Sequence, residues 1–146
     1  VPKPHTPFQW PAQKPLEYLQ DVERRLASRA RGSRVHLKAH DPRKSFLEAV
    51  FARGDRRLSK VLVEARKQGC RFDEWHEYFN YDRWMRVFQT AGVDPASYAD
   101  REFTVQDVLP WEHLDVRFSK DQLWKDYQES LESARQRETA HVQETR

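Results

Sequence analysis

The segment with the clearest chemical character is a turn that carries three arginines and one aspartate. Its sequence, Ala-Arg-Gly-Asp-Arg-Arg-Leu, covers residues 52–58. A glycine between two helices permits a tight turn, and the first amides of the following helix are free to bind an anion. Guanidinium groups bind carboxylates and phosphates through paired hydrogen bonds. These features predict an anion-binding turn formed by Arg53, Arg56 and Arg57, with Asp55 as the cap of the following helix. The residue spacing alone favours a plainer interpretation, a helix C-cap followed by an N-cap, with arginines in solvent or paired to Asp55 and Glu64.

A second segment, residues 71–88, combines aromatic and acidic side chains. Seven of the protein's eighteen aromatic residues lie here, interleaved with acids rather than lysines, which argues against a nucleic-acid stacking platform. A carboxylate near His76 could support acid–base hydrolysis, since three acids are close in sequence: Asp73, Glu74 and Glu77. The helical spacing of Trp84, Met85 and Phe88 is more typical of core packing than of a pocket.

Residues that could bind a metal are few. The single cysteine, Cys70, excludes an internal disulfide and cannot assemble a cluster site by itself. Cys70, His76 and His113 lack a zinc-binding spacing, while His36 and His40 share a face without a third ligand nearby. We therefore expect no metal site in this segment.

The elements that position these residues are mostly helices, and four glycines mark where the helices end. Apolar residues at helical spacing predict helices over residues 15–31, 42–53, 56–68, 81–91 and from 120 onward, with a short helical turn after Asp94. Alternation of apolar and polar residues predicts a strand over residues 35–40. The fold class is thus mainly α with a small β part. Residues 133–146 offer little to bury, and we expect them to fray.

The first fifteen residues contain five of the eight prolines. Proline at this density excludes a helix and the interior of a sheet, so Val1–Trp10 should lie extended as an edge strand or a covering loop, and its apolar residues suit burial. The segment is therefore expected to complete a structure whose other strands lie upstream, which would make this chain the C-terminal part of a larger protein.

Composition narrows the class of protein. Hydrophobic residues make up 38% and charged residues 34%, which gives a modest core. No stretch approaches the roughly 18 apolar residues of a membrane span, and no signal peptide is evident, so we expect a cytoplasmic protein without membrane contact. The net charge is +3, but residues 1–69 carry +9 and residues 70–146 carry −6. The basic half could face an anionic partner or, as the charged helical faces favour, the acidic half of the same chain.

Four motifs together resemble a known family. They are VPKPHTPFQW, HDPRKSFLEAVFARGDRRLSKVLVEARKQGCRFDEW, FNYDRWMRVFQTAGVDP and LPWEHLDVRFSKDQLWKDY. In order and spacing they resemble the C-terminal region of the uncharacterised radical SAM proteins that carry an N-terminal cobalamin-binding-like domain. The resemblance reaches to about residue 132. It implies that residues 1–40 are the end of a partial β/α barrel (last strand, helix, strand), that residues 41–132 form a helical C-terminal domain, and that residues 133–146 are a tail.

The resemblance also implies a function. A radical SAM enzyme holds a [4Fe-4S] cluster on a Cys-x-x-x-Cys-x-x-Cys loop and binds S-adenosylmethionine at the fourth iron, and cobalamin is a further cofactor that the family name suggests. This chain has only Cys70, so these cofactors would be bound upstream, and the helices would cover the barrel and shape a substrate pocket, for a substrate that carries an anionic part. The residues implied for that pocket are His5, Thr6, Arg53, Asp55, Arg56 and Arg57. The alternatives are an RNA- or protein-docking module, suggested by the +9 half, and a hydrolase that uses His76.

Overall fold

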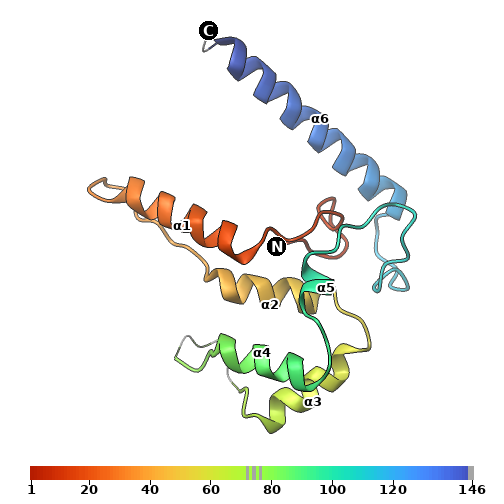
Figure 1. Ribbon diagram of the computed structural model, residues 1–146. Coiled ribbons are helices and arrows are strands. Elements are labelled where there is room, and N and C mark those ends of the chain that lie inside the picture. The colour runs from red at the N-terminus through yellow and green to blue at the C-terminus, as the bar shows by residue number, and fades with distance from the viewer. Residues whose placement is uncertain (72, 74, 76, 145–146) are drawn as a thin grey trace.

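The computed structural model describes residues 1–144 except 72, 74 and 76, with side chains as far as residue 139. The described residues form six helices and no strand (Figure 1). The helices are α1 (Leu16–Ala30), α2 (Pro42–Ala52), α3 (Leu58–Lys67), α4 (Tyr81–Thr90), α5 (Ala96–Ala99) and α6 (Lys120–Glu144). The mainly helical prediction is confirmed. None of the helices in this part of the chain combines the length and apolar character that a membrane crossing requires.

Local signals explain where the helices begin and end. Pro42 occupies the first turn of α2, and the Asp41 carboxylate accepts a hydrogen bond from the amide of Arg43 at 2.8 Å. The Ser119 hydroxyl accepts the amide of Gln122 at the start of α6 in the same way. At the end of α3, Gly69 adopts a φ of +78°, a conformation that side chains disfavour. The predicted helices therefore agree with the observed ones to within one or two residues, save that α6 extends further.

The main hydrophobic cluster, which we call the helical core, contains residues of α2, α3, α4 and α5. Its aromatic centre is Phe51, Trp84 and Phe88, with Phe51 meeting Trp84 edge to face at 5.4 Å between ring centroids. Trp84 and Phe88 are buried, which confirms that they pack rather than face solvent. Its fully or nearly fully buried aliphatic members include Ala49, Val50, Val61, Val87 and Ala99.

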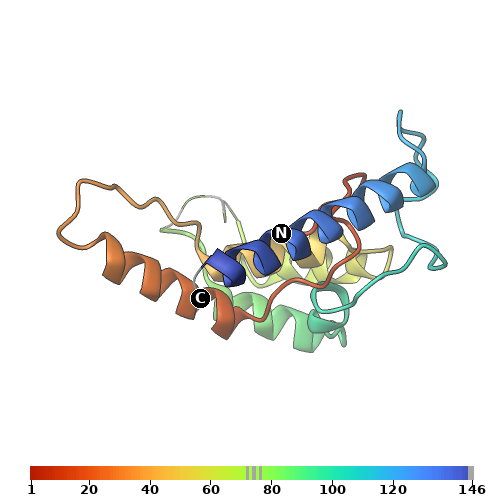
Figure 2. The same cartoon turned by 90° about the horizontal axis from the view of Figure 1, so that it is seen from above.

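A second cluster, the terminal core, brings together segments that are far apart in sequence. It consists of Trp10, Phe103, Leu109, Trp111, Leu123 and Tyr127. The amide of Phe103 donates to the carbonyl of Trp10 at 2.8 Å, and Trp10 meets Trp124 edge to face. The first two turns of α6 are thereby fixed to the N-terminal segment, and the rest of α6 projects from the body (Figures 1 and 2).

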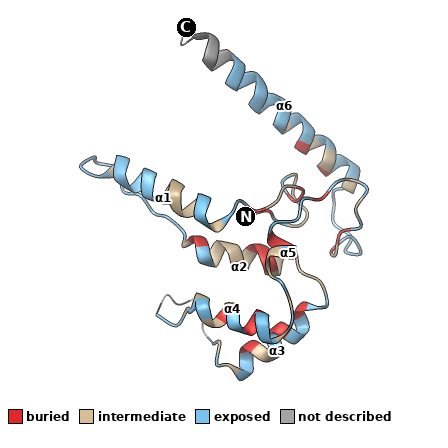
Figure 3. Cartoon of the chain, in the orientation of Figure 1, coloured by how far each residue is buried: buried red, intermediate tan, exposed pale blue. Residues whose placement is uncertain are grey.

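The strand predicted over residues 35–40 is wrong, and of the two alternatives for residues 1–10 the structure shows a loop and not an edge strand. Residues 1–10 form a series of turns rather than an extended strand, and only Pro2, Gln9 and Trp10 among them are buried. Residues 35–40 are irregular and exposed, as Figure 3 shows in pale blue. Alternating apolar residues stabilise a strand only when a neighbouring strand supplies hydrogen bonds and a buried face, and no such neighbour exists among the described residues.

The expected fraying beyond residue 133 is also not what the structure shows, because α6 continues to Glu144. Residues 133–139 are all exposed, so interactions within the helix, rather than packing against the body, stabilise this part of it. Strong helix formers and an i, i+4 hydrogen bond from Gln136 to Glu132 account for it.

Candidate functional site

The arginine-rich turn between α2 and α3 does not gather its three guanidinium groups. Arg53 points inward and is 1% exposed. Its guanidinium donates to the carbonyl oxygens of Ala99 and Arg101 and lies 4.7 Å from the ring centroid of Phe103. Burial, with the nearby positive charge of Arg101, lowers the pKa of Arg53 to about 10, so it remains charged at neutral pH. Arg53 is thus a packing residue that joins α2 to the 99–103 segment.

Asp55 and Arg57 form a closed pair at the surface of this turn. The Arg57 guanidinium donates to both Asp55 oxygens, at 2.6 to 3.0 Å, and the Tyr98 hydroxyl donates to the same carboxylate at 3.1 Å. These bonds, that from the Arg57 side chain foremost, lower the pKa of Asp55 to about 2. Arg56 is exposed. The Asp55 carboxylate also accepts the Arg57 amide, although Arg57 itself occupies the N-cap position of α3 and no side chain caps that helix.

His5 and Thr6 lie elsewhere, beside the terminal core. His5 has a φ of +57°, an unusual conformation for a residue with a side chain. Its amide donates to Oε1 of Gln9 at 2.9 Å, and the same oxygen accepts the indole N–H of Trp111 at 2.8 Å. The Thr6 hydroxyl donates to the carbonyl of Lys3. Both residues thus help to shape the N-terminal turns, and neither belongs to the arginine-rich turn.

A small cavity of about 60 Å³ opens next to His5. Gln9 and Trp111 line its wall, and Lys120 lies at its edge, where its ammonium donates to Glu112 at 3.0 Å and to the carbonyl of Asp107 at 2.6 Å. The amide of Leu109 and then Lys120 lower the pKa of the Glu112 carboxyl. Because the charged groups are already paired, the cavity offers a new ligand little beyond its apolar wall. Its volume is that of a water or two rather than of a substrate.

An apolar hollow with polar groups at its edge lies on the helical core. It measures about 420 Å³ and is lined by Leu47, Phe51, Phe79 and Trp84, with His40, Lys44, Glu48 and Asp73 around it. The indole N–H of Trp84 is buried without a hydrogen-bond partner. The volume falls in the range of small-molecule sites. The sequence pattern did identify Trp84 as a packing residue, but nothing local in the sequence places Phe51 and Phe79 in the same hollow with it.

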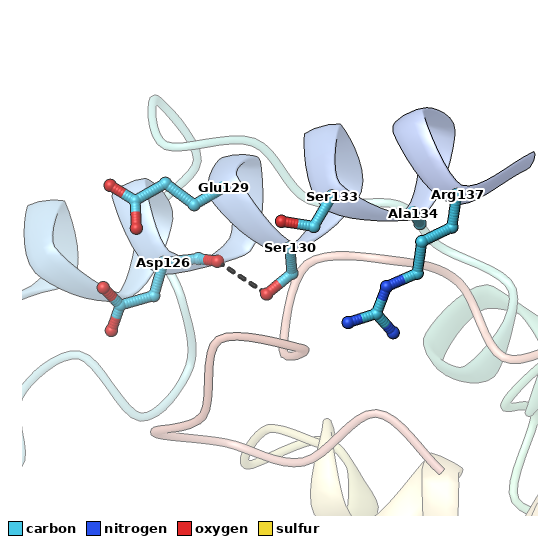
Figure 4. Close-up of a pocket in the computed structure, with 6 residues that line it drawn as sticks. All are labelled: Asp126, Glu129, Ser130, Ser133, Ala134 and Arg137. Carbon is cyan, nitrogen blue, oxygen red and sulfur yellow. Dashed lines mark hydrogen bonds between the residues drawn. The ribbon is translucent and has the colours of Figure 1, made fainter. Parts of the chain in front are cut away.

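A wider concavity of about 510 Å³ lies along α6 (Figure 4). Six residues of that one helix line it: Asp126, Glu129, Ser130, Ser133, Ala134 and Arg137. The hydrogen bond drawn there, from the Ser130 hydroxyl to the Asp126 carbonyl at 2.8 Å, is internal to the helix. No second element supplies a lining residue, so this concavity is a helix face rather than a chemical site.

The metal and acid–base candidates give no assembled centre. Within the described ranges, no group of three His, Cys, Asp or Glu side chains is placed to hold a metal ion. Burial, followed by the charge of Asp73, raises the pKa of the Cys70 thiol, which disfavours the thiolate that binds metals. His76 and Glu74, two members of the hydrolase hypothesis, lie outside the described residues.

Comparison of the chain with protein-family models, with curated protein sequences and with solved structures found no match.

Proposed function

We propose that this chain is the C-terminal portion of a radical SAM iron–sulfur enzyme, in which it covers the catalytic barrel, shapes the substrate pocket and does not catalyse the reaction alone. The observation that carries the proposal is the succession of four motifs, in order and at similar spacing, over nearly the whole chain. The arrangement of the first thirty residues supports it.

Those thirty residues expose apolar side chains that a covering role would bury. None of the residues of α1 is buried, although its apolar residues recur at helical spacing and α2 lies alongside. Val1, Phe8, Tyr18 and Leu26 remain between 44 and 53% exposed. Each such side chain gains about 1.5 to 3 kcal/mol when it passes from full exposure to full burial. Contact with an upstream barrel would supply that burial.

The cofactors of such an enzyme do not fit this chain by itself. A [4Fe-4S] cluster that binds S-adenosylmethionine takes three cysteine thiolates, and the sequence contains Cys70 alone. The proposal therefore assigns the cluster, S-adenosylmethionine and any cobalamin to the upstream part. Of the arginines assigned to the pocket, Arg56 and Arg57 are at the surface and accessible to a substrate, while Arg53 is buried.

The test is a binding experiment between this chain and the polypeptide encoded immediately upstream of Val1. The proposal expects that reading frame to contain the three-cysteine loop and its product to copurify with this chain. Aspartate at Phe8 and Tyr18 should abolish copurification, because the contact is apolar. The matched control places aspartate at Leu62 and Val63 of α3, which are 53% and 59% exposed, and should copurify as the wild type does.

Two results would overturn the proposal. An upstream frame without the three-cysteine loop removes the cluster, and equal loss of copurification in both variants shows that the first thirty residues are not the contact. Circular dichroism of each variant establishes that it is folded before the comparison is made.

A further inference from the structure

Positive charge is concentrated in one continuous and almost wholly exposed stretch of the chain. Residues 24–40, which we call the basic arm, comprise the last turns of α1 and the irregular segment that leads to α2. The arm contains six of the 26 lysines and arginines and none of the 23 acids. All of its residues are exposed except Ala30, which is half-buried. Without the arm, acids outnumber basic residues in the rest of the chain.

The acidic half of the chain does not neutralise this charge. Each ion pair between described residues joins two residues of the same half, as in Lys3–Glu48 and Lys120–Glu112. Within the arm, Arg24 and Arg25 pair with Asp21 on the preceding turn. The remaining four basic residues of the arm, which take part in none of these ion pairs, are Arg29, Arg31, Arg34 and Lys38. The internal compensation favoured by the sequence is thus absent from the described pairs.

The backbone of the arm is open as well. No backbone-to-backbone hydrogen bond involves residues 34–40 in the described part of the chain. The segment is a tether between α1 and α2 at one end of the molecule (Figures 1 and 2). The nine steps from residue 31 to residue 40 span up to about 30 Å when the chain is extended. The arm can therefore lie along several units of a linear polymer.

We infer that the basic arm binds the phosphate backbone of a nucleic acid without reading its bases. Five of its six basic residues are arginines, whose planar fork matches phosphate oxygens. A repeating polyanion suits an arm with no fixed conformation, because any register brings phosphates to the guanidinium groups. The arm contains no aromatic residue on which a base could stack. In the part of the arm that follows α1, the apolar residues besides Ala39 are Val35 and Leu37. These are too few to insert into a bilayer.

The inference stands independently of the radical SAM proposal and has its own test. The full chain is titrated by fluorescence anisotropy into a labelled oligouridine and a labelled oligothymidine, each of about 20 nucleotides. Because the contacts are to phosphates, both strands should bind with similar affinity. The affinity should fall steeply between about 50 and 200 mM salt, with up to about 0.7 in log–log slope for each basic residue engaged.

The matched variants replace the same number of charges in two places. Glutamine at Arg29, Arg31, Arg34 and Lys38 should weaken binding at least tenfold at low salt and reduce the slope by about 3. Glutamine at Lys60, Arg66, Lys67 and Arg71, exposed residues in and just after α3, should leave the slope nearly unchanged. Both variants should melt within about 2 °C of the wild type, because the replaced side chains are on the surface.

Three outcomes would overturn the inference. These are no binding of either strand at about 50 mM salt, an equal loss in both variants, or binding of phosphatidylserine vesicles that depends on the arm while the oligonucleotides do not bind. The last outcome would assign the arm to a membrane surface instead.

Discussion

Arg53 links the two hydrophobic clusters. Its guanidinium starts from the end of α2 in the helical core, bonds to the carbonyls of Ala99 and Arg101 and stacks on Phe103 of the terminal core. Its Nε has no hydrogen-bond partner, so the burial of this charge is only partly compensated. Because its guanidinium is buried and already occupied by these contacts, Arg53 acts as a structural link rather than as a substrate ligand.

The first prediction follows from that link. Replacement of Arg53 by methionine should lower the free energy of unfolding by about 3 kcal/mol, because one buried and one partly buried carbonyl lose a charged donor. Lysine should recover part of the loss, since an ammonium cannot reproduce the fork. Urea denaturation measures both. Methionine at the exposed Arg56 is the control, with an expected change below about 0.5 kcal/mol; equal effects at the two positions would contradict the role of Arg53.

The second prediction concerns Asp55 and the stability of the folded chain at low pH. The pKa of Asp55 is about 2 in the folded chain, below its ordinary value of 3.8. A lowered pKa contributes stability that is complete above about pH 4 and is lost as pH falls through about 2. At about 1.4 kcal/mol per pKa unit, the lowering from 3.8 to about 2 corresponds to about 2.5 kcal/mol. Since Arg57 is exposed and solvent screens the pair, we expect about 1 kcal/mol in total.

The measurement compares the wild type with Asp55→Asn by urea denaturation between about pH 5 and pH 2. The difference in unfolding free energy between them should shrink as the pH falls, while the other acids contribute equally to both proteins. A difference that stays constant over this range would show that the carboxylate of Asp55 gains nothing from Arg57 and Tyr98.

At the scale of the element, the chain shows which signals are local and which are not. The start of α2 could be predicted because Asp41 and Pro42 act within one turn, and the end of α3 because Gly69 does. The alternation at residues 35–40 was misleading, since a strand depends on a partner that the sequence of the segment does not specify. The burial of Arg53 could not be predicted for a similar reason: the sequence shows three arginines near a glycine but not that one of them reaches Ala99.

Helix α6 provides the third prediction, because only its first turns touch the body. Leu123 is 4% exposed and Leu131, two turns later, is 40% exposed. Leu123→Ala should lower the free energy of unfolding by about 3 kcal/mol through loss of packing in the terminal core. Leu131→Ala should change it by less than about 1 kcal/mol. Thermal and urea unfolding test the pair, and similar losses would mean that α6 is held along its length.

At the scale of the whole molecule, the terminal core is the feature that the sequence did not reveal. Trp10 and Trp111 belong to one cluster although about a hundred residues separate them, and the bond from Trp111 to Gln9 joins the same segments. Periodicity identifies helix faces but not which loops close upon each other, so the burial of Trp10 was expected against missing strands and is instead supplied by residues 103–127. Val1 and Phe8 remain exposed.

The fourth prediction concerns the isolated chain as a cofactor protein. Anaerobic reconstitution with iron and sulfide should give no visible absorbance from a bound cluster, because Cys70 is the single cysteine and its thiol is partly buried. The Cys70→Ser variant should give the same spectrum. A stoichiometric cluster that disappears in the variant would show that this chain takes part directly in cluster binding.

The way α6 is attached also gives the molecule a mechanical property. A helix of 25 residues is about 37 Å long, and its attachment through Leu123 and Tyr127 occupies only the first third of that length. It is therefore a lever whose pivot lies in the terminal core. A tilt of about 10° at the pivot moves the far end by about 5 Å with no break in the helix. Small changes in the packing of Trp10, Trp124 and Tyr127 would therefore produce large displacements of the outer turns of α6 and of any molecule bound there.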